Sequence, residues 1–419
     1  MTSGTPTTMG TIQGPTRRRL WWTISGLILL GVTLWALRSG LVLYWSKACV
    51  RSQDSRQWED LEKTAAIWAR WQPEAVEPWL FLADAAQRQN RFLEAADFLS
   101  RVPRQSDKAV PALQARLQIL CGPANRPLEG ELACRELLAI ESRATLAHQS
   151  LIQFYALTLQ RTKLRDQVRE AIALDREPPE SYVYYFLGDT LRLSNGVSMN
   201  SRWLATDPDQ ELYLVAHLLH QEAAAPPEEL ESQQPDRSAD SAILSQKEQE
   251  ARELLQKFPQ NTNLLAYLID QEISKGSASA VLELFRHVPK QAESEGRFWR
   301  FKGWLHYSRG ELAEAESDYR RALELFPMDW LSLSRLSEVL RAQQRMDDIP
   351  RIQELVHQAQ DIRSQIRDLG TTEHVPESVL KDIGRLARGC GDNLIANALE
   401  KRLNVGGGDR PGQSSAALK

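Results

Sequence analysis

The sequence predicts an all-α protein of antiparallel helix pairs with a repeat period of about 34 residues, preceded by one transmembrane helix. Three observations support this fold class. An uncharged run, Leu20–Leu37, follows three arginines near the N-terminus. A pattern of tryptophan, tyrosine, glycine and alanine recurs along much of the chain. Two segments rich in proline, glycine and serine, 223–240 and 405–419, interrupt and end that pattern.

Length and composition limit the possible functions. A chain of 419 residues can form two or three ordinary domains or one long repeat array. The formal net charge of -4 creates no strong field toward nucleic acid, so no nucleic-acid partner is expected. The four cysteines are far apart and form no C-x-x-C motif, which argues against a zinc ribbon. Cys121 and Cys134 could form a disulfide or lie as two buried thiols in a helical core.

The N-terminal segment predicts a membrane anchor. Residues 1–19 are predicted as a disordered basic tail. As a helix, Leu20–Leu37 would be about 27 Å long, close to the thickness of a bilayer core. Aromatic residues that suit the two bilayer interfaces flank this run: Trp21, Trp22, Tyr44 and Trp45. Residues 20–45 are therefore predicted as a transmembrane anchor and juxtamembrane helix, with all repeat contacts beginning later.

A cleaved signal peptide is the alternative, since Ser46-Lys47-Ala48 resembles a cleavage site. The apolar run is longer than a typical signal peptide requires, which favours an uncleaved anchor. Arg17–Arg19 form a tighter basic cluster than the basic residues after the span. This asymmetry predicts a single-pass topology with the repeat domain on the extracytoplasmic, periplasmic side.

The clearest repeat unit is 296–329. Its signature residues are Trp299, Gly303, Gly310, Ala315, Tyr319, Ala322 and Pro327. Their spacing matches a repeat signature with a period of about 34 residues. Equivalent positions recur one step earlier and one step later, so 262–295, 296–329 and 330–363 run in register without a gap.

The same template fits elsewhere in the chain. Trp79, Ala83 and Ala95 place a unit at 76–109, and a degraded unit lies near 377–410. Helix pairing between 111 and 222 is less regular. The residues equivalent to Gly310 in the other units are Asn90, Gly276, Gln344 and Gly391.

The small residues have a packing role in this interpretation. Two helix axes come within about 8–10 Å only where the crossing residues are small, as at Gly303, Ala315 and Ala322. Gly310 lies in the turn, where a residue without a Cβ accepts any backbone state. Pro327 has no N–H to continue a helix and ends the unit.

With this signature, the chain resembles a tetratricopeptide repeat protein. The resemblance implies an α-solenoid with a concave groove that binds peptides or proteins. It covers a predicted N-terminal array at 57–222 and a C-terminal array at 241–404. The acidic segment 223–240 is predicted as a disordered insertion and 405–419 as a disordered tail.

Catalytic motifs are missing from the sequence. It contains no phosphate-binding glycine-rich loop and no G-x-S-x-G. His217 and His220 share a helix face and could in principle hold a metal, but no third ligand is evident. The chain is therefore predicted not to be an enzyme, with no catalytic residues, no metal, no cofactor and no small-molecule substrate.

The predicted partner-binding groove consists of arginine beside aromatic rings: Arg297, Arg300, Trp304, Tyr307 and Arg341. Such a surface suits an acidic, extended segment, either another protein or the chain's own 223–240. Alternatively, the arginines form a solvated face and the rings belong to the core. The family's Lys/Asn carboxylate clamp is not supported, because Trp304 occupies one of its asparagine positions.

The predicted function is a membrane-anchored scaffold for protein–protein interaction. The alternative is an accessory or regulatory subunit of a cell-envelope enzyme or of a secretion or biogenesis complex. Under both hypotheses the partners are other proteins and, through the N-terminal helix, the membrane.

Overall fold

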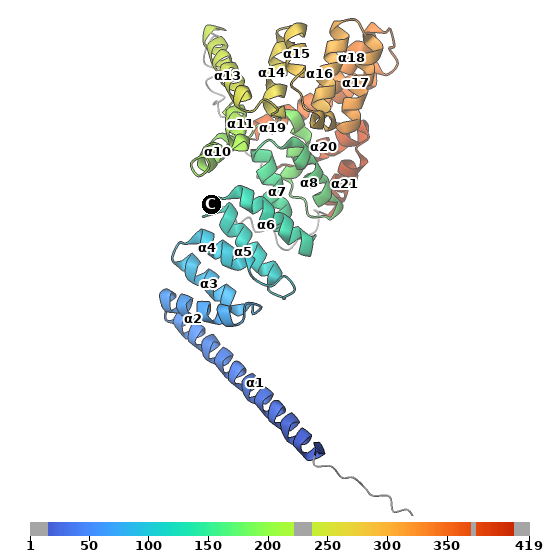
Figure 1. Ribbon diagram of the computed structural model, residues 1–419. Coiled ribbons are helices and arrows are strands. Elements are labelled where there is room, and N and C mark those ends of the chain that lie inside the picture. The colour runs from blue at the N-terminus through green and yellow to red at the C-terminus, as the bar shows by residue number, and fades with distance from the viewer. Residues whose placement is uncertain (1–15, 222–236, 370–373, 406–419) are drawn as a thin grey trace, which may run out of the picture. The chain divides into compact units, whose positions relative to one another are not determined.

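The structure, a computed structural model, describes residues 16–221, 237–369 and 374–405, and every regular element in these ranges is a helix (Figure 1). Side chains are described except at 16–28, 31, 34–36, 237–245 and 405. The chain divides into two compact units, 1–112 and 113–419. The all-α prediction is confirmed for the described residues.

The described part of unit 1, residues 16–112, contains four complete helices and the start of a fifth. These are α1 (Thr16–Asp54), α2 (Trp58–Trp71), α3 (Glu77–Arg88), α4 (Phe92–Ser100) and the first part of α5 (Ala109–Cys121).

In its described residues, unit 2 contains the rest of α5 and the helices that follow it. They are α6 (Pro127–Ile140), α7 (Thr145–Leu157), α8 (Arg161–Ala173), α9 (Glu180–Leu187), η1 (Gly188–Thr190), α10 (Gly196–Leu204), α11 (Glu211–His220), α13 (Arg237–Lys257), α14 (Thr262–Ser274), α15 (Ala278–Phe285), η3 (Lys290–Ser294), α16 (Gly296–Ser308), α17 (Leu312–Leu325), α18 (Trp330–Ala342), α19 (Ile349–Asp368), α20 (Glu377–Cys390) and α21 (Asn393–Val405).

The turns inside the helix pairs confirm the predicted register. Every residue aligned with Gly310 has a positive φ: Asn90 59°, Gly276 72°, Gly310 78°, Gln344 62° and Gly391 84°. This left-handed backbone reverses the chain between the first and second helix of each pair. Glycine adopts it without strain, and asparagine accepts it more readily than glutamine does.

The same left-handed turn also occurs in helix pairs that lack most of the signature residues. Arg56, Asn125 and Leu159 also have positive φ, at 55°, 54° and 55°. Together with Asn90 they follow one another at steps of about 34 residues, the period of the repeat. The pairs α5–α6 and α7–α8 therefore keep the period in a segment where the sequence pattern is weak.

The turn at Arg56 also shows that the end of α1 is the first helix of a pair with α2. Trp45 and Cys49 are buried in one core cluster with Leu61, Ala65 and Trp68 of α2. The predicted boundary after residue 45 is therefore wrong: the helix is continuous, and repeat packing begins within it.

The predicted span lies largely outside the described side chains. Among the residues whose side chains are described, no helix has a stretch long and apolar enough to cross a membrane. Most of Leu20–Leu37 falls outside that set, so the anchor stays a prediction.

Three predicted irregular segments overlap helices at their edges. Helix α1 begins at Thr16, inside the predicted N-terminal tail, and α13 begins at Arg237, inside the predicted insertion. Helix α21 ends at Val405, the first residue of the predicted C-terminal tail. The remaining parts, 1–15, 222–236 and 406–419, lie outside the described residues.

Small residues lie at the helix crossings, as predicted. Ala83, Ala95, Ala315 and Ala322 are buried. A Cβ added to Gly303 would come within 3.0 Å of the Tyr319 ring, which is itself fully buried. Helices α16 and α17 can therefore pack this closely only because position 303 has no side chain.

The two signature tryptophans make the same contacts in different units. The indole N–H of Trp79 and that of Trp299 each donate to the backbone carbonyl six residues earlier, at 2.9 and 2.8 Å. An arginine at the same later position of each unit covers the ring: Arg101 at 5.3 Å and Arg321 at 6.0 Å from the ring centroid. The repeated geometry identifies these tryptophans as structural residues of the repeat.

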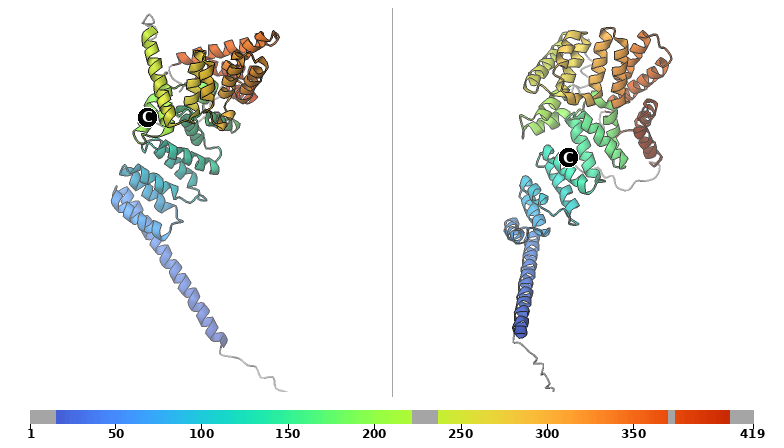
Figure 2. Two further views of the ribbon diagram at one scale, coloured as in Figure 1. Left: turned by 45° about the horizontal axis from the view of Figure 1, so that its top comes forward. Right: turned by 45° about the vertical axis from the view of Figure 1, so that its right-hand side comes forward.

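Unit 2 departs from a linear array because its C-terminal pair packs on its middle. Helix α21 contacts α8 and α20 contacts α9 (Figures 1 and 2). The buried Asp392 carboxylate accepts bonds from Tyr185 at 2.7 Å and from Arg169 at 3.1 Å. Neighbour-only packing, which the solenoid implied, is therefore wrong for this unit.

The cysteine alternatives are resolved in favour of free thiols. Cys49, Cys121, Cys134 and Cys390 are all unpaired. Burial raises the pKa of Cys49 and that of Cys121 to about 11, so these thiols stay protonated at neutral pH.

The Gly303 crossing yields a stability prediction. Gly303→Leu should destabilise unit 2 by about 1–3 kcal/mol, because the new side chain must displace Tyr319. Hydrogen exchange mapped along the chain should show lost protection across unit 2, with 76–109 unchanged. The exposed neighbour Lys302→Leu should cost less than about 1 kcal/mol. Equal loss of protection in both units would contradict the separation of their cores.

Candidate functional site

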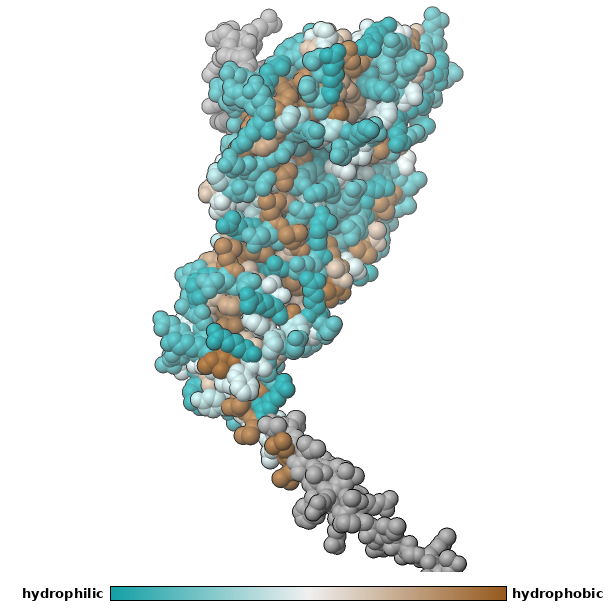
Figure 3. Space-filling view, viewed as in Figure 1, coloured by the Kyte–Doolittle hydropathy of each residue, from teal (hydrophilic) through white to brown (hydrophobic). Residues whose placement is uncertain are grey.

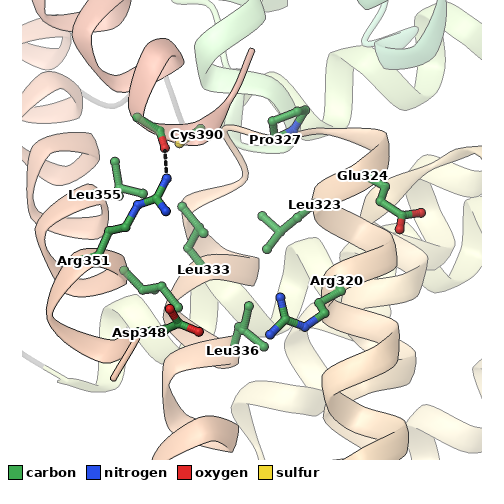
Figure 4. Close-up of a pocket in the computed structure, with 12 residues that line it drawn as sticks. Arg320, Leu323, Glu324, Pro327, Leu333, Leu336, Asp348, Arg351, Leu355 and Cys390 are labelled. Atoms are coloured by element: carbon green, nitrogen blue, oxygen red, sulfur yellow. Dashed lines mark hydrogen bonds between the residues drawn. The ribbon is translucent and has the colours of Figure 1, made fainter. Parts of the chain in front are cut away.

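A pocket of ≈ 440 Å³ between α17, α18, α19 and α20 is the candidate binding site (Figure 4). Its apolar surface comes mainly from leucine and isoleucine side chains, and its charged side chains come from α17 and α19. The lining residues are Arg320, Leu323, Glu324, Pro327, Leu333, Leu336, Asp348, Arg351, Ile352, Leu355, Gly389 and Cys390.

Local sequence features shape this pocket. Helix α17 ends at Leu325, two residues before Pro327, which cannot continue the helical hydrogen bonds. On the opposite side, a Cβ added to Gly389 would lie 2.6 Å from Leu355. The missing side chain therefore lets α20 approach α19 and form one wall. Leu333, Leu336 and Leu355 are almost fully buried and form the apolar floor.

Two of the charged residues at the pocket are already paired. Both the Nε and an Nη of Arg320 donate to Glu316, at 3.0 and 2.9 Å. Glu324 accepts a bond from Arg321 at 2.6 Å. These two side chains are therefore held by their own helix and contribute little free charge.

Arg351 is different because it has no carboxylate partner among the described residues. Its Nη2 donates at 3.1 Å to the carbonyl of Gly389, near the end of α20 (Figure 4). The remaining N–H groups of this exposed guanidinium are available to a ligand. An exposed guanidinium without a carboxylate partner can bind the carboxylate of a ligand through two parallel hydrogen bonds.

Cys390 gives the pocket no nucleophile. Burial raises the pKa of this thiol to about 12, because the charged thiolate would be poorly solvated. Among the described residues, no group of three or more His, Cys, Asp or Glu side chains could hold a metal ion. The arrangement is suited to binding an apolar side chain with a neighbouring acid.

The predicted groove arginines lie elsewhere, inside the unit. Arg300 is 7% exposed and donates to Asp329 at 2.6 Å and to Asp189 at 3.3 Å. Burial would lower its pKa, but these two carboxylates raise it above the usual value. Arg297 is 4% exposed and donates to Glu295 at 2.8 Å. Neither guanidinium can meet a partner, so the predicted binding role of both is corrected to a structural one.

The other three groove residues do not line the pocket. Trp304 and Tyr307 are half-buried, and Trp304 packs against the core around α14 and α16. Arg341 is exposed. A binding role for these three stays a prediction. The acidic segment proposed as an internal ligand lies mostly outside the described residues.

The buried arginines belong to a polar cluster that links distant helices. Asn263 accepts from Arg161 at 2.6 Å and from Arg297 at 3.0 Å through the same side-chain oxygen. Burial, together with the nearby Arg297 and Arg192, lowers the pKa of Arg161. This buried cluster therefore connects α8, α14 and α16.

The histidine pair is not a metal site in this geometry. Nε2 of His220 lies 3.0 Å from the carbonyl of Leu157, and Nδ1 accepts from the backbone N–H of Leu193 at 3.1 Å. Both ring nitrogens are thus occupied by backbone. A Cβ on Gly196 would lie 2.4 Å from this ring, so the imidazole is tightly enclosed. His217, in contrast, is half-buried beside Ser201.

Comparison with known protein families finds a match within unit 2. Residues 296–329 match the family model of the tetratricopeptide repeat. The match covers α16 and α17 and confirms a tetratricopeptide repeat at the predicted bounds. No curated protein sequence matches the chain.

Three solved structures show distant similarity. A tetratricopeptide repeat protein from Parabacteroides merdae ATCC 43184 is 11% identical, with 72% of this chain and 99% of that chain covered and a TM-score of 0.27. The APC/C hetero-tetramer Cut9–Hcn1 is 10% identical, with 86% and 71% covered and a TM-score of 0.31. The human IFIT1 dimer with m7Gppp-AAAA is 11% identical, with 86% and 89% covered and a TM-score of 0.32. Scores this low do not transfer partners or ligands to this chain.

The enclosed His220 predicts a pH-dependent stability. Burial lowers its folded-state pKa to about 4, below the usual value of 6.5. The unfolded chain therefore binds a proton first as the pH falls, and stability decreases between pH 6.5 and 4. The full loss should be about 3 kcal/mol. Denaturant unfolding at several pH values would measure it.

His220→Gln is the control for this prediction. Glutamine does not titrate, so the variant should lack the part of the pH dependence that belongs to residue 220. If the wild type and the variant lose stability in parallel between pH 6.5 and 4, the imidazole is not the responsible group.

Proposed function

We propose that this chain is a membrane-tethered helical-repeat scaffold that binds another protein through the pocket between α17, α18, α19 and α20. The observation that carries the proposal is an apolar floor next to Arg351, whose exposed guanidinium has no carboxylate partner among the described residues. The tetratricopeptide repeat at 296–329 forms one side of this pocket through α17.

The chemistry of the pocket defines the partner segment. A large apolar side chain would enter the space above Leu333 and Leu336, where it replaces water on apolar surface. An acidic group next to it would pair with Arg351. Asp348 at the start of α19 offers one carboxylate to a backbone N–H or a basic residue of the same segment.

The tether is supported by the sequence and by exposed apolar side chains. Eight of the fifteen large hydrophobic side chains that are exposed among the described residues lie on α1. They are Leu29, Leu30, Val32, Leu37, Leu41, Leu43, Tyr44 and Val50. Figure 3 shows hydrophobic side chains gathered at the described end of this helix. An apolar helix surface of this kind favours contact with lipid over contact with water.

The topology follows from the basic cluster Arg17–Arg19 before the span. We place the repeat units on the extracytoplasmic side, since basic residues flank the cytoplasmic end of a span. Protease added outside sealed cells should then digest the repeat units without permeabilisation. Protection until the membrane is opened would reverse this topology.

The alternative function is an accessory or regulatory subunit of a cell-envelope enzyme or of a secretion or biogenesis complex. The same pocket would then dock the chain onto that assembly. Crosslinking in intact membranes distinguishes the two, since a subunit yields one stable partner set and a scaffold yields exchangeable ones.

The binding prediction concerns one charge on α19. Arg351→Ala should weaken a selected peptide about tenfold, the effect of losing roughly 1.4 kcal/mol of charge-assisted bonding. Peptides would be selected from a random library on the full chain in lipid nanodiscs. Titration of the selected peptides would give the affinity of each variant.

The matched control is Arg367→Ala, an exposed arginine on the same helix that does not line the pocket. It should bind as the wild type does. The peptides selected on wild type should share an apolar residue beside an acidic one. If both variants bind equally, or the peptides lack this pair, the pocket is not the binding site.

The tether prediction uses the corrected boundary of the first helix pair. Deleting residues 1–39 should release a folded protein from membranes, because Gly40 is exposed and has open space around it. Deleting residues 1–49 should destabilise unit 1, since it also removes the buried Trp45 and Cys49. Fractionation and circular dichroism measure both. A 1–39 deletion that stays with membranes would show that residues after 39 hold the chain there without the span, which contradicts the tether as the main attachment.

A further inference from the structure

We propose that the corner formed by α1 and α2 in unit 1 rests on the lipid headgroups, with Tyr44 and Trp71 in contact with the membrane interface. This inference rests on the proposed tether and extends it. It assigns a second membrane contact to a helix that lies outside the predicted span.

Helix α1 continues from the predicted span into the repeat fold. This helix runs from Thr16 to Asp54 without interruption, and its end packs in the core of the first pair. No loop separates the predicted span from the repeat fold. The position of the first pair along the membrane normal therefore follows from helix geometry alone.

The end of α2 lies beside residue 45 of α1, which sets its height along the membrane normal. Trp71 packs on Trp45 with ring centroids 5.8 Å apart. Residue 45 comes eight residues after Leu37, about 12 Å along a helix. Headgroup regions occupy about 5–8 Å on each side of a bilayer core. A tryptophan ring at residue 45 or 71 thus lies just beyond the headgroups and within reach of them.

The aromatic side chains at this corner are exposed. Trp71 is 62% exposed and Tyr44 is 67% exposed, although both carry large rings. Ile67, one turn from Trp71 on α2, is 46% exposed. Tryptophan and tyrosine favour the membrane interface because their rings are apolar at one end and polar at the other.

Charge contributes less than these rings. Lys47 and Arg70 are exposed near the same corner and would attract anionic headgroups. Glu74 follows three residues after Trp71 and is also exposed, so it offsets part of that attraction. The contact is therefore expected on zwitterionic and anionic lipids alike.

A bilayer explains this surface better than a second protein copy does. The exposed hydrophobic side chains continue from Leu29 through Tyr44 along α1 and then onto α2. These side chains begin in the predicted span and end where the headgroup region of the adjoining leaflet would lie, as expected for a surface that contacts one leaflet.

The test measures the depth of the corner. A spin label is attached to Arg70→Cys in the full chain, reconstituted into phosphatidylcholine nanodiscs. The four native thiols label slowly because burial raises their pKa values: to about 11 for Cys49 and Cys121, to about 12 for Cys390, and well above the usual value for Cys134. Collisions with oxygen report lipid, and collisions with a water-soluble nickel complex report solvent.

The expected result is an oxygen-to-nickel ratio at residue 70 several times that at Lys63→Cys. Residue 63 is an exposed control on the same helix, farther from Trp71. Adding Trp71→Ser should move the label at residue 70 toward water. The wild type, treated with the same label, gives the background of the native thiols.

Two other results would overturn the inference. Equal ratios at residues 70 and 63 in a chain that stays in the nanodisc leave the tether intact but remove the second contact. Strong spin–spin broadening at residue 70 would assign the surface to a second copy. A chain that fails to enter the nanodisc contradicts the tether itself.

Discussion

Buried pairing between arginine and aspartate holds the centre of unit 2 together. Arg300 joins Asp329 to Asp189, and Arg161 donates to the backbone carbonyl of Asp189 at 3.1 Å. These residues come from α16, α8, η1 and the turn before α18, so several helix pairs share one set of bonds. Removing one partner of such a pair leaves an uncompensated buried charge, which costs about 3–5 kcal/mol. The packing of the surrounding helices depends on this cluster remaining complete.

The cluster also explains why the proposed binding surface lies away from Arg297 and Arg300. Arg297 and Arg300 are buried together with the groups they bond, so a partner protein cannot reach them. At the pocket, Arg351 has no carboxylate partner among the described residues, and it lies where α19 meets the end of α20. That meeting requires Gly389 against Leu355. Helix α20 in turn belongs to the pair that the Asp392 contacts hold on α8 and α9. The Asp392 contacts hold α20 in place, and α20 in turn positions Gly389, whose carbonyl accepts a bond from Arg351. The charge at the pocket therefore depends on buried bonds elsewhere in unit 2.

The proposed tether belongs to the same repeat architecture. A helix that extends from the predicted span into the first pair makes the anchor and the repeat one element. Trp45 belongs to the long first helix and is also part of the repeat core, since it is buried against α2 and contacts the exposed Trp71. In the proposed tether, a continuous helix would hold unit 1 at a set height above a bilayer, whereas a flexible linker would let it move freely.

The sequence by itself determined the helix pairs and their register. Gly310 and its equivalents, the small residue at Gly303 and the stop at Pro327 act within one unit, so their spacing is readable along the chain. It did not reveal that Arg297 and Arg300 are buried, because their aspartate and asparagine partners lie 29 to 111 residues away. It also missed Arg351, although an arginine beside Ile352 and Leu355 on a helix was a usable signal. Only the tertiary structure decided these points, since contact between distant pairs, such as Arg169 with Asp392 across 223 residues, leaves no periodic trace in the sequence.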